Sequence, residues 1–207
     1  MFKIDEPVLV NLNTIKYSEL SKKEILKDYV FNNENIKLDK NVEIKRCKFD
    51  GIIFDEVNIK FGTLEDVEFI NCDLSNLTFI DAHIFRVSFK NCKLFGINFI
   101  DTTLNNVIIE DSMCSMSNFT GVKIHNSKIR DSNFKSSNIE NGELKNIIID
   151  RVNFSSSSFI KTPLKDIDLS NSNIEEINID LNCIKESIIS LEQTMDLIGL
   201  LGVKIKE

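Results

Sequence analysis

The chain has 207 residues, 42% of them apolar and 28% charged, which excludes disorder as the default state and predicts a folded chain. Lys and Arg number 25 against 32 Asp and Glu, and the formal net charge of -7 disfavours direct binding to nucleic acid or to an anionic membrane. No run approaches the roughly 18 apolar residues of a membrane-spanning helix, and Asp5, Glu6 and Pro7 lie where a secretion signal would be apolar. We therefore expect a cytoplasmic protein.

Residues 1–41 precede the regular part of the chain and are predicted to form a cap with one short helix. Ser21-Lys22-Lys23-Glu24 is a capping box, in which the Ser and Glu side chains satisfy the first backbone amides of a helix. The residues that follow place apolar groups on one side of that helix: Ile25, Leu26, Tyr29 and Val30. Because isolated short helices are marginally stable, a frayed polar arm is the alternative.

The middle of the chain is organised by a period of five residues. From Ile44 to Ile179 every fifth residue is apolar, without a slip over 28 positions, and these are ten Phe, ten Ile, seven Leu and one Cys. Neither the helical period of 3.6 nor the strand period of 2 keeps such a row on one face. Five residues must therefore form one side of a larger repeating unit.

Each repeat has the same internal order. Two residues before the large apolar residue lies a smaller one, such as Val42 or Cys47, and in an extended segment both point to the same face. Turn-forming residues follow, as in Asp50-Gly51 and Ser170-Asn171.

On these residues, the segment 42–181 resembles the pentapeptide-repeat proteins. The resemblance implies an all-β fold, a right-handed quadrilateral β-helix with four pentapeptides in each square coil, so that residues twenty apart stack directly. The 28 repeats then make seven coils. At a spacing of about 4.8 Å the rod is roughly 34 Å long.

Residues of one type gather in the same column when the sequence is read at a spacing of twenty. We expect aromatic rings to stack from coil to coil at eight core positions: Phe49, Phe69, Phe89, Phe79, Phe99, Phe119, Phe134 and Phe154. Cys114 interrupts the column of Phe134 and Phe154, and its small side chain is expected to leave a cavity.

The five cysteines are odd in number and scattered, which does not fit a secreted disulfide framework. Cys72 and Cys92 occupy equivalent inward positions one coil apart, close enough for a disulfide to form. A redox-sensitive crosslink is one interpretation. We favour the other, that the two are reduced thiols filling narrow positions in the core.

No residue pattern predicts catalysis, a metal or a cofactor. The two histidines, His83 and His125, face outward in the coiled arrangement and have no neighbouring ligand cluster. Phosphate-binding glycine loops, nucleophile elbows and zinc-protease motifs are absent from the sequence. A rod filled with side chains also offers no cleft, so we expect that the protein is not an enzyme.

Residues 182–207 are predicted to form a helix followed by a short strand at Val203–Ile205. Ser190-Leu191-Glu192-Gln193 is a second capping box, and Gly202 suits a helix end. The apolar residues of this helix are a candidate dimer interface: Leu191, Met195, Ile198 and Leu201. The resemblance implies this use, because in fluoroquinolone-resistance members a C-terminal helix joins two monomers end to end. A helix that only caps its own rod is the alternative.

Two interpretations of the outer surface remain open. The fluoroquinolone-resistance members imitate duplex DNA and bind DNA gyrase or topoisomerase IV, and the resemblance implies a similar partner here. Residues 42–181 carry 15 basic and 21 acidic residues, a net of −6, or about 30% of the charge density of B-DNA over the rod. Projecting loops that matter in some of those members are missing.

The second interpretation is a protein-interaction scaffold with another partner and no role at a topoisomerase. Its support is a group of outward apolar residues that includes Ile80, Ile100, Phe85 and Phe95. The candidate partner surface for both interpretations consists of stacked acidic and apolar positions: Asp81, Asp101, Asp111, Asp131, Ile80 and Ile100.

Overall fold

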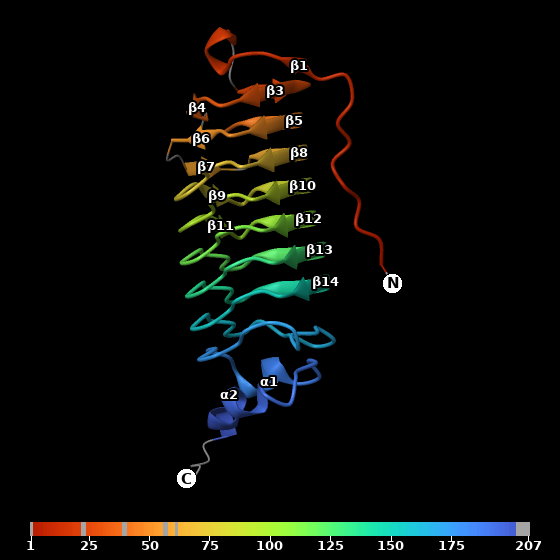
Figure 1. The fold of residues 1–207 in the computed structure, drawn as a ribbon, viewed down its shortest axis with the longest axis vertical. Coiled ribbons are helices and arrows are strands. Elements are labelled where there is room, and N and C mark those ends of the chain that lie inside the picture. The colour runs from red at the N-terminus through yellow and green to blue at the C-terminus, as the bar shows by residue number, and fades with distance from the viewer. Residues whose placement is uncertain (1, 22–23, 39–40, 56–57, 61, 202–207) are drawn as a thin grey trace.

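The chain winds into an elongated rod of stacked coils, a parallel β-solenoid of about seven turns (Figure 1). The computed structural model describes residues 2–21, 24–38, 41–55, 58–60 and 62–201. The largest sheet contains parallel strands of eight residues that each bend around one corner: β5 (Glu43–Asp50), β8 (Thr63–Ile70), β10 (His83–Lys90), β12 (Thr103–Glu110), β13 (Lys123–Arg130) and β14 (Glu143–Asp150). The predicted all-β coil is confirmed.

Two narrower sheets lie on other sides of the rod. One contains β7 (Asn58–Lys60), β9 (Thr78–Ile80) and β11 (Asn98–Ile100), and the other pairs β4 (Asn35–Ile36) with β6 (Ile53–Phe54). Beyond β11 and β14 the same stacking continues as single bridges, for example Asn118 with Asn138. The sides of the rod are thus short extended segments joined by corners.

The corners show directly that each coil has four sides. In the coil that contains β8, the residues Asp66, Asn71, Asn76 and Asp81 have φ of 56°, 54°, 60° and 52°, and the same five-residue spacing recurs in the following coils. A left-handed residue at each corner turns the chain by one side. Asn, Asp and Gly adopt this conformation at low cost, which explains how a chain with only seven glycines can turn so often.

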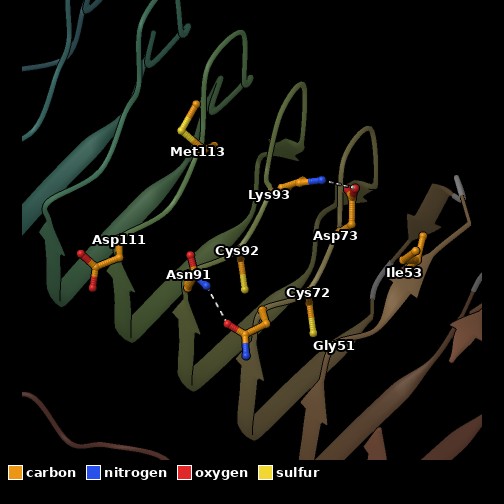
Figure 2. Close-up of a pocket in the computed structure, with 10 residues that line it drawn as sticks. Gly51, Ile53, Cys72, Asp73, Asn91, Cys92, Lys93, Asp111 and Met113 are labelled. Atoms are coloured by element: carbon orange, nitrogen blue, oxygen red, sulfur yellow. Dashed lines mark hydrogen bonds and ion pairs between the residues drawn. The ribbon is translucent and has the colours of Figure 1, made fainter. Parts of the chain in front are cut away.

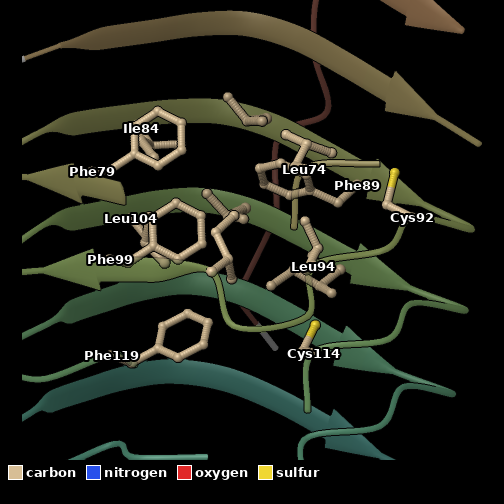
Figure 3. Packing of buried hydrophobic residues seen from close by; sticks show 14 of the residues in the cluster. Leu74, Phe79, Ile84, Phe89, Cys92, Leu94, Phe99, Leu104, Cys114 and Phe119 are labelled. Atoms are coloured by element: carbon tan, nitrogen blue, oxygen red, sulfur yellow. The ribbon is translucent and has the colours of Figure 1, made fainter. Parts of the chain in front are cut away.

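Residues twenty apart are in register, as the column pattern predicts. Phe49 pairs with Phe69 across β5 and β8, and their rings lie 5.0 Å apart at an interplanar angle of 10°. Phe79 and Phe99 stack at 5.2 Å, and Phe99 and Phe119 at 5.3 Å with a larger tilt (Figure 3). All eight aromatic residues of the predicted columns are at most 2% exposed.

The prediction of a cavity at Cys114 is wrong in its position. Cys114 is fully buried below Leu94 (Figure 3). A space of about 10 Å³ lies further along the core among residues that include Phe119, Phe134 and Phe154, and Cys114 does not line it. The rings there are tilted rather than parallel, and Phe134 and Phe154 meet at 46°. The looser packing therefore falls beside these rings and not at Cys114.

The prediction of a short N-terminal helix is wrong. Ser21 and Glu24 of its capping box are described, but residues 22–23 are outside the described part, and the following segment forms β2 (Ile25–Lys27) and β3 (Tyr29–Asn32). Both strands pair in parallel with β5, at an offset of eighteen residues instead of twenty. Phe31 stacks on Phe49 at 5.1 Å. The open edge of β5 offers backbone hydrogen-bond partners, and this pairing outweighs a local capping preference.

The chain before these strands completes the N-terminal end. Strand β1 (Asn13–Thr14) pairs with β3, and a 3-10 turn, η1 (Tyr17–Glu19), buries the Tyr17 ring against Phe31. Residues 2–12 leave the first coil and run along the outside of the rod (Figure 1). The coiled region therefore begins before residue 42, and at the other end a bridge between Asp168 and Ile188 extends it past residue 181.

The C-terminal capping box is confirmed by reciprocal hydrogen bonds. The Ser190 amide donates to the Gln193 side chain at 2.8 Å, and the Gln193 amide donates to the Ser190 hydroxyl at 3.3 Å. Helix α2 (Thr194–Ile198) and the 3-10 turn η2 (Gly199–Leu201) follow, after a helix that the sequence did not predict, α1 (Leu181–Ile184). The predicted strand at Val203–Ile205 and Gly202 lie outside the described residues.

Replacing a stacked ring is expected to destabilise the rod strongly. Phe99→Ala should lower the free energy of unfolding by about 3–5 kcal/mol, because Phe99 is fully buried between two stacked rings. Phe95→Ala is the matched control, since that ring is 47% exposed, and it should cost less than about 1 kcal/mol. Urea unfolding followed by circular dichroism measures both, and equal losses would contradict the stacked core.

Candidate interaction surface

Any functional site on this rod lies on its outside, because the core is filled with stacked side chains. Along each side the residues next to the buried row point outward, and they recur every twenty residues as columns. Within the described residues, no group of three or more His, Cys, Asp or Glu is placed to hold a metal ion. Of the two histidines, His125 contacts Glu143 at 3.1 Å between Nε2 and Oε1.

The four predicted aspartates all occupy left-handed corners, with φ between 49° and 52°. Asp81 and Asp101 follow one another in one corner column, and Asp111 and Asp131 in another. Asp81, Asp101 and Asp111 are exposed and form no ion pair among the residues that the structure describes. These three carboxylates are the free negative charges of the predicted surface.

Asp131 differs from the other three because two arginines neutralise it. Arg151 donates to both of its carboxylate oxygens, at 2.6 and 2.8 Å, and Arg130 lies at 2.9 Å. The hydrogen bond from Arg151 holds the pKa of Asp131 below its usual value. Asp131 therefore contributes little net negative charge to the corner.

Ion pairs also neutralise acidic residues on the large sheet. Glu68 on β8 lies 3.4 Å from both Lys48 and Lys90, on the strands to either side. Glu110 on β12 pairs with Lys128 on β13 at 2.5 Å. Because cations and carboxylates alternate from coil to coil, this face is not a continuous negative stripe.

Uncharged amides line a side of the second half of the rod. Asn118 and Asn138 belong to one bridged column, and each accepts a hydrogen bond at 3.0 Å from the amide two residues later. Asn153 and Asn173 repeat this arrangement in the neighbouring column. Their side-chain oxygens support the local turn, so these columns present few groups for a charged partner.

The predicted apolar positions are brought together but only partly exposed. Ile80 and Ile100 are register partners on β9 and β11, and both are half-buried. The Phe85 ring is covered by the Arg86 guanidinium, 4.1 Å from its centroid, whereas Phe95 is 47% exposed. Other apolar residues that the sequence analysis did not assign to this surface are more exposed than these, among them Ile53, Met113 and Met116, at 53%, 51% and 63%.

A shallow depression of about 470 Å³ lies on the corner that carries Asp111 (Figure 2). Ile53 and Met113 stand at the two ends of one of its columns, with Asp73 and Lys93 between them as an ion pair of 3.8 Å. Asn91 donates to Asn71 at 2.6 Å in the adjoining corner column. Because Asp73 and Lys93 pair with each other, the depression presents two apolar ends and a polar middle without net charge.

Cys72 and Cys92 form the base of this depression as free thiols, 1% and 2% exposed. A hydrogen bond from the Cys92 thiol lowers the pKa of Cys72, and the same contact together with burial raises the pKa of Cys92. Each sulfur also lies near a backbone carbonyl oxygen, such as that of Ile70 at 3.2 Å from Cys72. The two cysteines fill the narrow inward positions, which is the interpretation that the sequence favours.

Thiol accessibility provides a direct check on this arrangement. We expect iodoacetamide to leave the native protein unmodified at Cys47, Cys72, Cys92 and Cys114, and to label Cys183, which is 8% exposed, most readily of the five. In urea, intact-mass spectrometry should count five labels. Two fewer labels in urea, restored by a reductant, would show a Cys72–Cys92 disulfide and contradict the reduced pair.

Two of the four residues of the predicted dimer interface are exposed at the C-terminal end of the rod. Leu191 is 86% exposed and Met195 61%, whereas Ile198 is half-buried. Leu201 ends η2, and its side chain lies outside the described structure. Leu197 and Leu200 pack against the core instead, and Gln193 donates to the carbonyl oxygens of Leu169 and Ser172 at 2.8 and 2.6 Å. One side of α2 thus covers the last coil while the other remains open.

The family model for the pentapeptide repeat region matches residues 40–112 and 62–146, which together span more than half of the chain. The chain belongs to the pentapeptide-repeat family. A comparison with curated protein sequences finds no match. Among the described residues, no helix combines the length and apolarity needed to cross a membrane.

Solved structures of the family share the fold at low sequence identity. A trypsin-treated form of QnrB1, a plasmid-mediated fluoroquinolone resistance protein, is 16% identical, with a TM-score of 0.52 and coverage of 94% of this chain and 96% of that one. HetL, a pentapeptide-repeat protein involved in the regulation of heterocyst differentiation in the cyanobacterium Nostoc, is 11% identical, with a TM-score of 0.45 and coverage of 81% and 84%. At 16% identity the similarity to QnrB1 establishes the fold alone.

Proposed function

We propose that this pentapeptide-repeat protein is a non-enzymatic interaction rod, and that it binds a type II topoisomerase, DNA gyrase or topoisomerase IV, as a DNA-mimicking dimer that modulates fluoroquinolone sensitivity. The observation that carries the proposal is the match of nearly the whole chain to a QnrB1 structure along nearly its whole length. A filled core supports a function that depends on the outer surface.

The charges most suited to this role are the free corner carboxylates. Asp81 and Asp101 are stacked one coil apart, and Asp111 projects from a second corner. Exposed carboxylates that no cation neutralises attract the basic surface on which a topoisomerase holds DNA. Their number is small, so binding should depend strongly on these few positions.

The ion pairs among the other charged residues favour the second candidate function, a scaffold for a protein other than a topoisomerase. Glu68, Glu110 and Asp131 are matched by neighbouring cations, which leaves a largely balanced surface with exposed Ile53 and Met113 beside the depression. Such a mixed surface suits a scaffold for another protein. The topoisomerase assay below separates these two functions.

Purified protein should inhibit supercoiling by gyrase and reduce fluoroquinolone-stabilised DNA cleavage at micromolar concentrations. Asp81→Asn with Asp101→Asn should weaken both effects by about fivefold or more, because two unpaired charges are lost while Asn retains the left-handed corner. Asp166→Asn, at a left-handed corner of another column, is the control and should leave them unchanged. If the unaltered protein neither inhibits supercoiling nor reduces cleavage, topoisomerase binding is refuted and the scaffold function remains.

The dimer is tested at the open side of α2. If Met195 lies in the interface, the unaltered protein should have twice the monomer mass in light scattering, and Met195→Asp should be monomeric because it buries a charge there. Met116→Asp is the matched control, since Met116 is 63% exposed against 61% for Met195 but lies at a corner of the rod. A monomeric unaltered protein would refute the dimer.

A further inference from the structure

The large sheet ends before the rod does. β14 is the last strand in the order of that sheet (Figure 1), and residues 163–170 form the same side of the next coil. No backbone hydrogen bond joins β14 to residues 163–170 in the described part of the chain. We call this unpaired junction the β14 seam.

Pro163 removes the hydrogen bond at one end of the seam. In each of the five preceding coils, the amide at this position donates to a carbonyl oxygen of the coil before, as Glu143 does to Val122 at 2.9 Å. Proline has no amide hydrogen, so the Gly142 carbonyl oxygen receives no such bond. The sequence itself therefore interrupts the ladder at this coil.

The other end of the seam lacks its hydrogen bond as well. In each of the five preceding coils, the corner amide donates to a carbonyl oxygen of the next coil, as Asp131 does to Asp150 at 3.1 Å. The Arg151 amide has no backbone acceptor among the described residues. Asn171, the next residue of that corner column, lacks the positive φ of the six before it. The path of the coil therefore changes at the seam.

Inward side chains are less covered at the seam than in the middle of the rod. Leu144 and Ile147 are half-buried, whereas Leu104 and Val107, two coils earlier in the same columns, are 1% and 2% exposed. Leu144 and Ile147 also line the core space of about 10 Å³. Packing is thus incomplete on the side where backbone pairing stops.

The opposite sides of the same two coils remain paired. Asn153 forms a bridge with Asn173, and Ser158 forms one with Asn178. The Phe154 amide donates to the Asn173 carbonyl oxygen at 2.7 Å. The C-terminal part of the rod is therefore attached to the coil before it by backbone hydrogen bonds along only half of its perimeter.

Residues 163–201, which we call the C-terminal unit, are bonded to one another. The Leu169 amide donates to the Ile188 carbonyl oxygen at 2.8 Å. The Gln193 side chain donates to the carbonyl oxygens of Leu169 and Ser172, which attaches α2 to the same unit. A unit with these internal bonds can tilt without breaking them.

We propose that the C-terminal unit is hinged on the rod: it opens as one body along the β14 seam, about the paired sides at Asn173 and Asn178, and Pro163 keeps the seam unpaired. Opening breaks no backbone hydrogen bond across the seam, so its main cost is the exposure of apolar side chains there. Because α2 belongs to the unit, the hinge also changes the direction of the candidate dimer interface relative to the rod. That last consequence rests on the proposed dimer, whereas the hinge itself needs a single chain.

A thiol placed in the seam reports its opening. Ile167 follows Ile147 in its column and is 4% exposed, and Val107 is 2% exposed in the same column, on a strand paired on both sides. We expect iodoacetamide to modify Ile167→Cys in the folded full-length chain about tenfold or more faster than Val107→Cys. Peptide mass spectrometry separates both sites from the native cysteines. Equal rates would overturn the hinge.

A restored hydrogen bond at the seam should slow this labelling. In the Ile167→Cys chain, Pro163→Ala supplies an amide for the Gly142 carbonyl oxygen and should slow modification by about threefold or more. Pro7→Ala, in the N-terminal arm of residues 2–12, is the matched control and should leave the rate unchanged. Equal rates in these two chains would overturn the role of Pro163.

Amide hydrogen exchange in the unaltered chain distinguishes tilting of the unit from its unfolding. The Leu164 and Leu169 amides should exchange as slowly as the Phe154 amide, because their hydrogen bonds lie inside the unit. The Arg151 amide should exchange about tenfold or more faster than the Asp131 amide, which has a backbone acceptor. Fast exchange at Leu164 and Leu169 would show that the unit unfolds, and it would contradict the hinge.

Met195→Asp separates the hinge from the proposed dimer. Labelling of Ile167→Cys should be equally fast with and without Met195→Asp, because the seam lies within one chain. A monomeric unaltered protein in light scattering refutes the dimer alone, whereas slow labelling in both chains refutes the hinge alone.

Discussion

The structure depends on hydrogen bonds between parallel segments that lie twenty residues apart. To keep that register, each coil must turn four times in twenty residues, and at nearly all described corners the turn is made by a residue in the left-handed region, with Asn171 as an exception. Asn, Asp and Gly fill most corners, while Arg46, Arg86 and Met116 accept the same conformation at a cost of about 1 kcal/mol each. In the described part of the chain, the four sides close around stacked Phe, Leu and Ile and leave no room for a ligand in the interior. The twenty-residue register that forms the fold thus also leaves only the outward side chains available to contact a partner.

The sequence predicts the middle of the fold well because one constraint repeats there 28 times. The prediction from sequence fails at the N-terminal end, where the offset between neighbouring coils changes. Leu26, Phe31 and Ile36 continue the five-residue row, but at an offset of eighteen residues from the next coil, so a search for strict register misses them. The local capping box at Ser21 pointed to a helix, and the hydrogen bonds offered by the edge of β5 gave a strand instead. At Gln193 the capping pattern held, since no further coil competes for that segment.

The surface is less predictable than the core, because the net charge of a column does not show which charges are paired. Asp111 and Asp131 are equivalent in the sequence pattern, yet Arg130 and Arg151 neutralise only Asp131. The pairing depends on how long side chains lean across neighbouring coils, and this is set by rotamers that the repeat does not specify. The exposure of Ile80 and Ile100 was overestimated for a similar reason, since stacked β-branched residues cover one another. Column position therefore predicts neighbours reliably and accessibility only in part.

The N-terminal arm shows a second consequence of the regular rod. Corner residues that must be left-handed are often Asn or Asp, and their side chains stand in a line as hydrogen-bond acceptors spaced by one coil. The Asp5 and Val8 amides of the arm donate to two acceptors of that line, Asn106 and Asp66, at 3.0 Å each. Where those acceptors bond to neighbouring side chains, as at Asn71 and Asn91, the line is already satisfied. Asp66 and Asn106 instead accept backbone amides, and the same chemistry holds the N-terminal arm against the rod. The corner residues that allow the chain to coil therefore also determine where its N-terminal arm is attached.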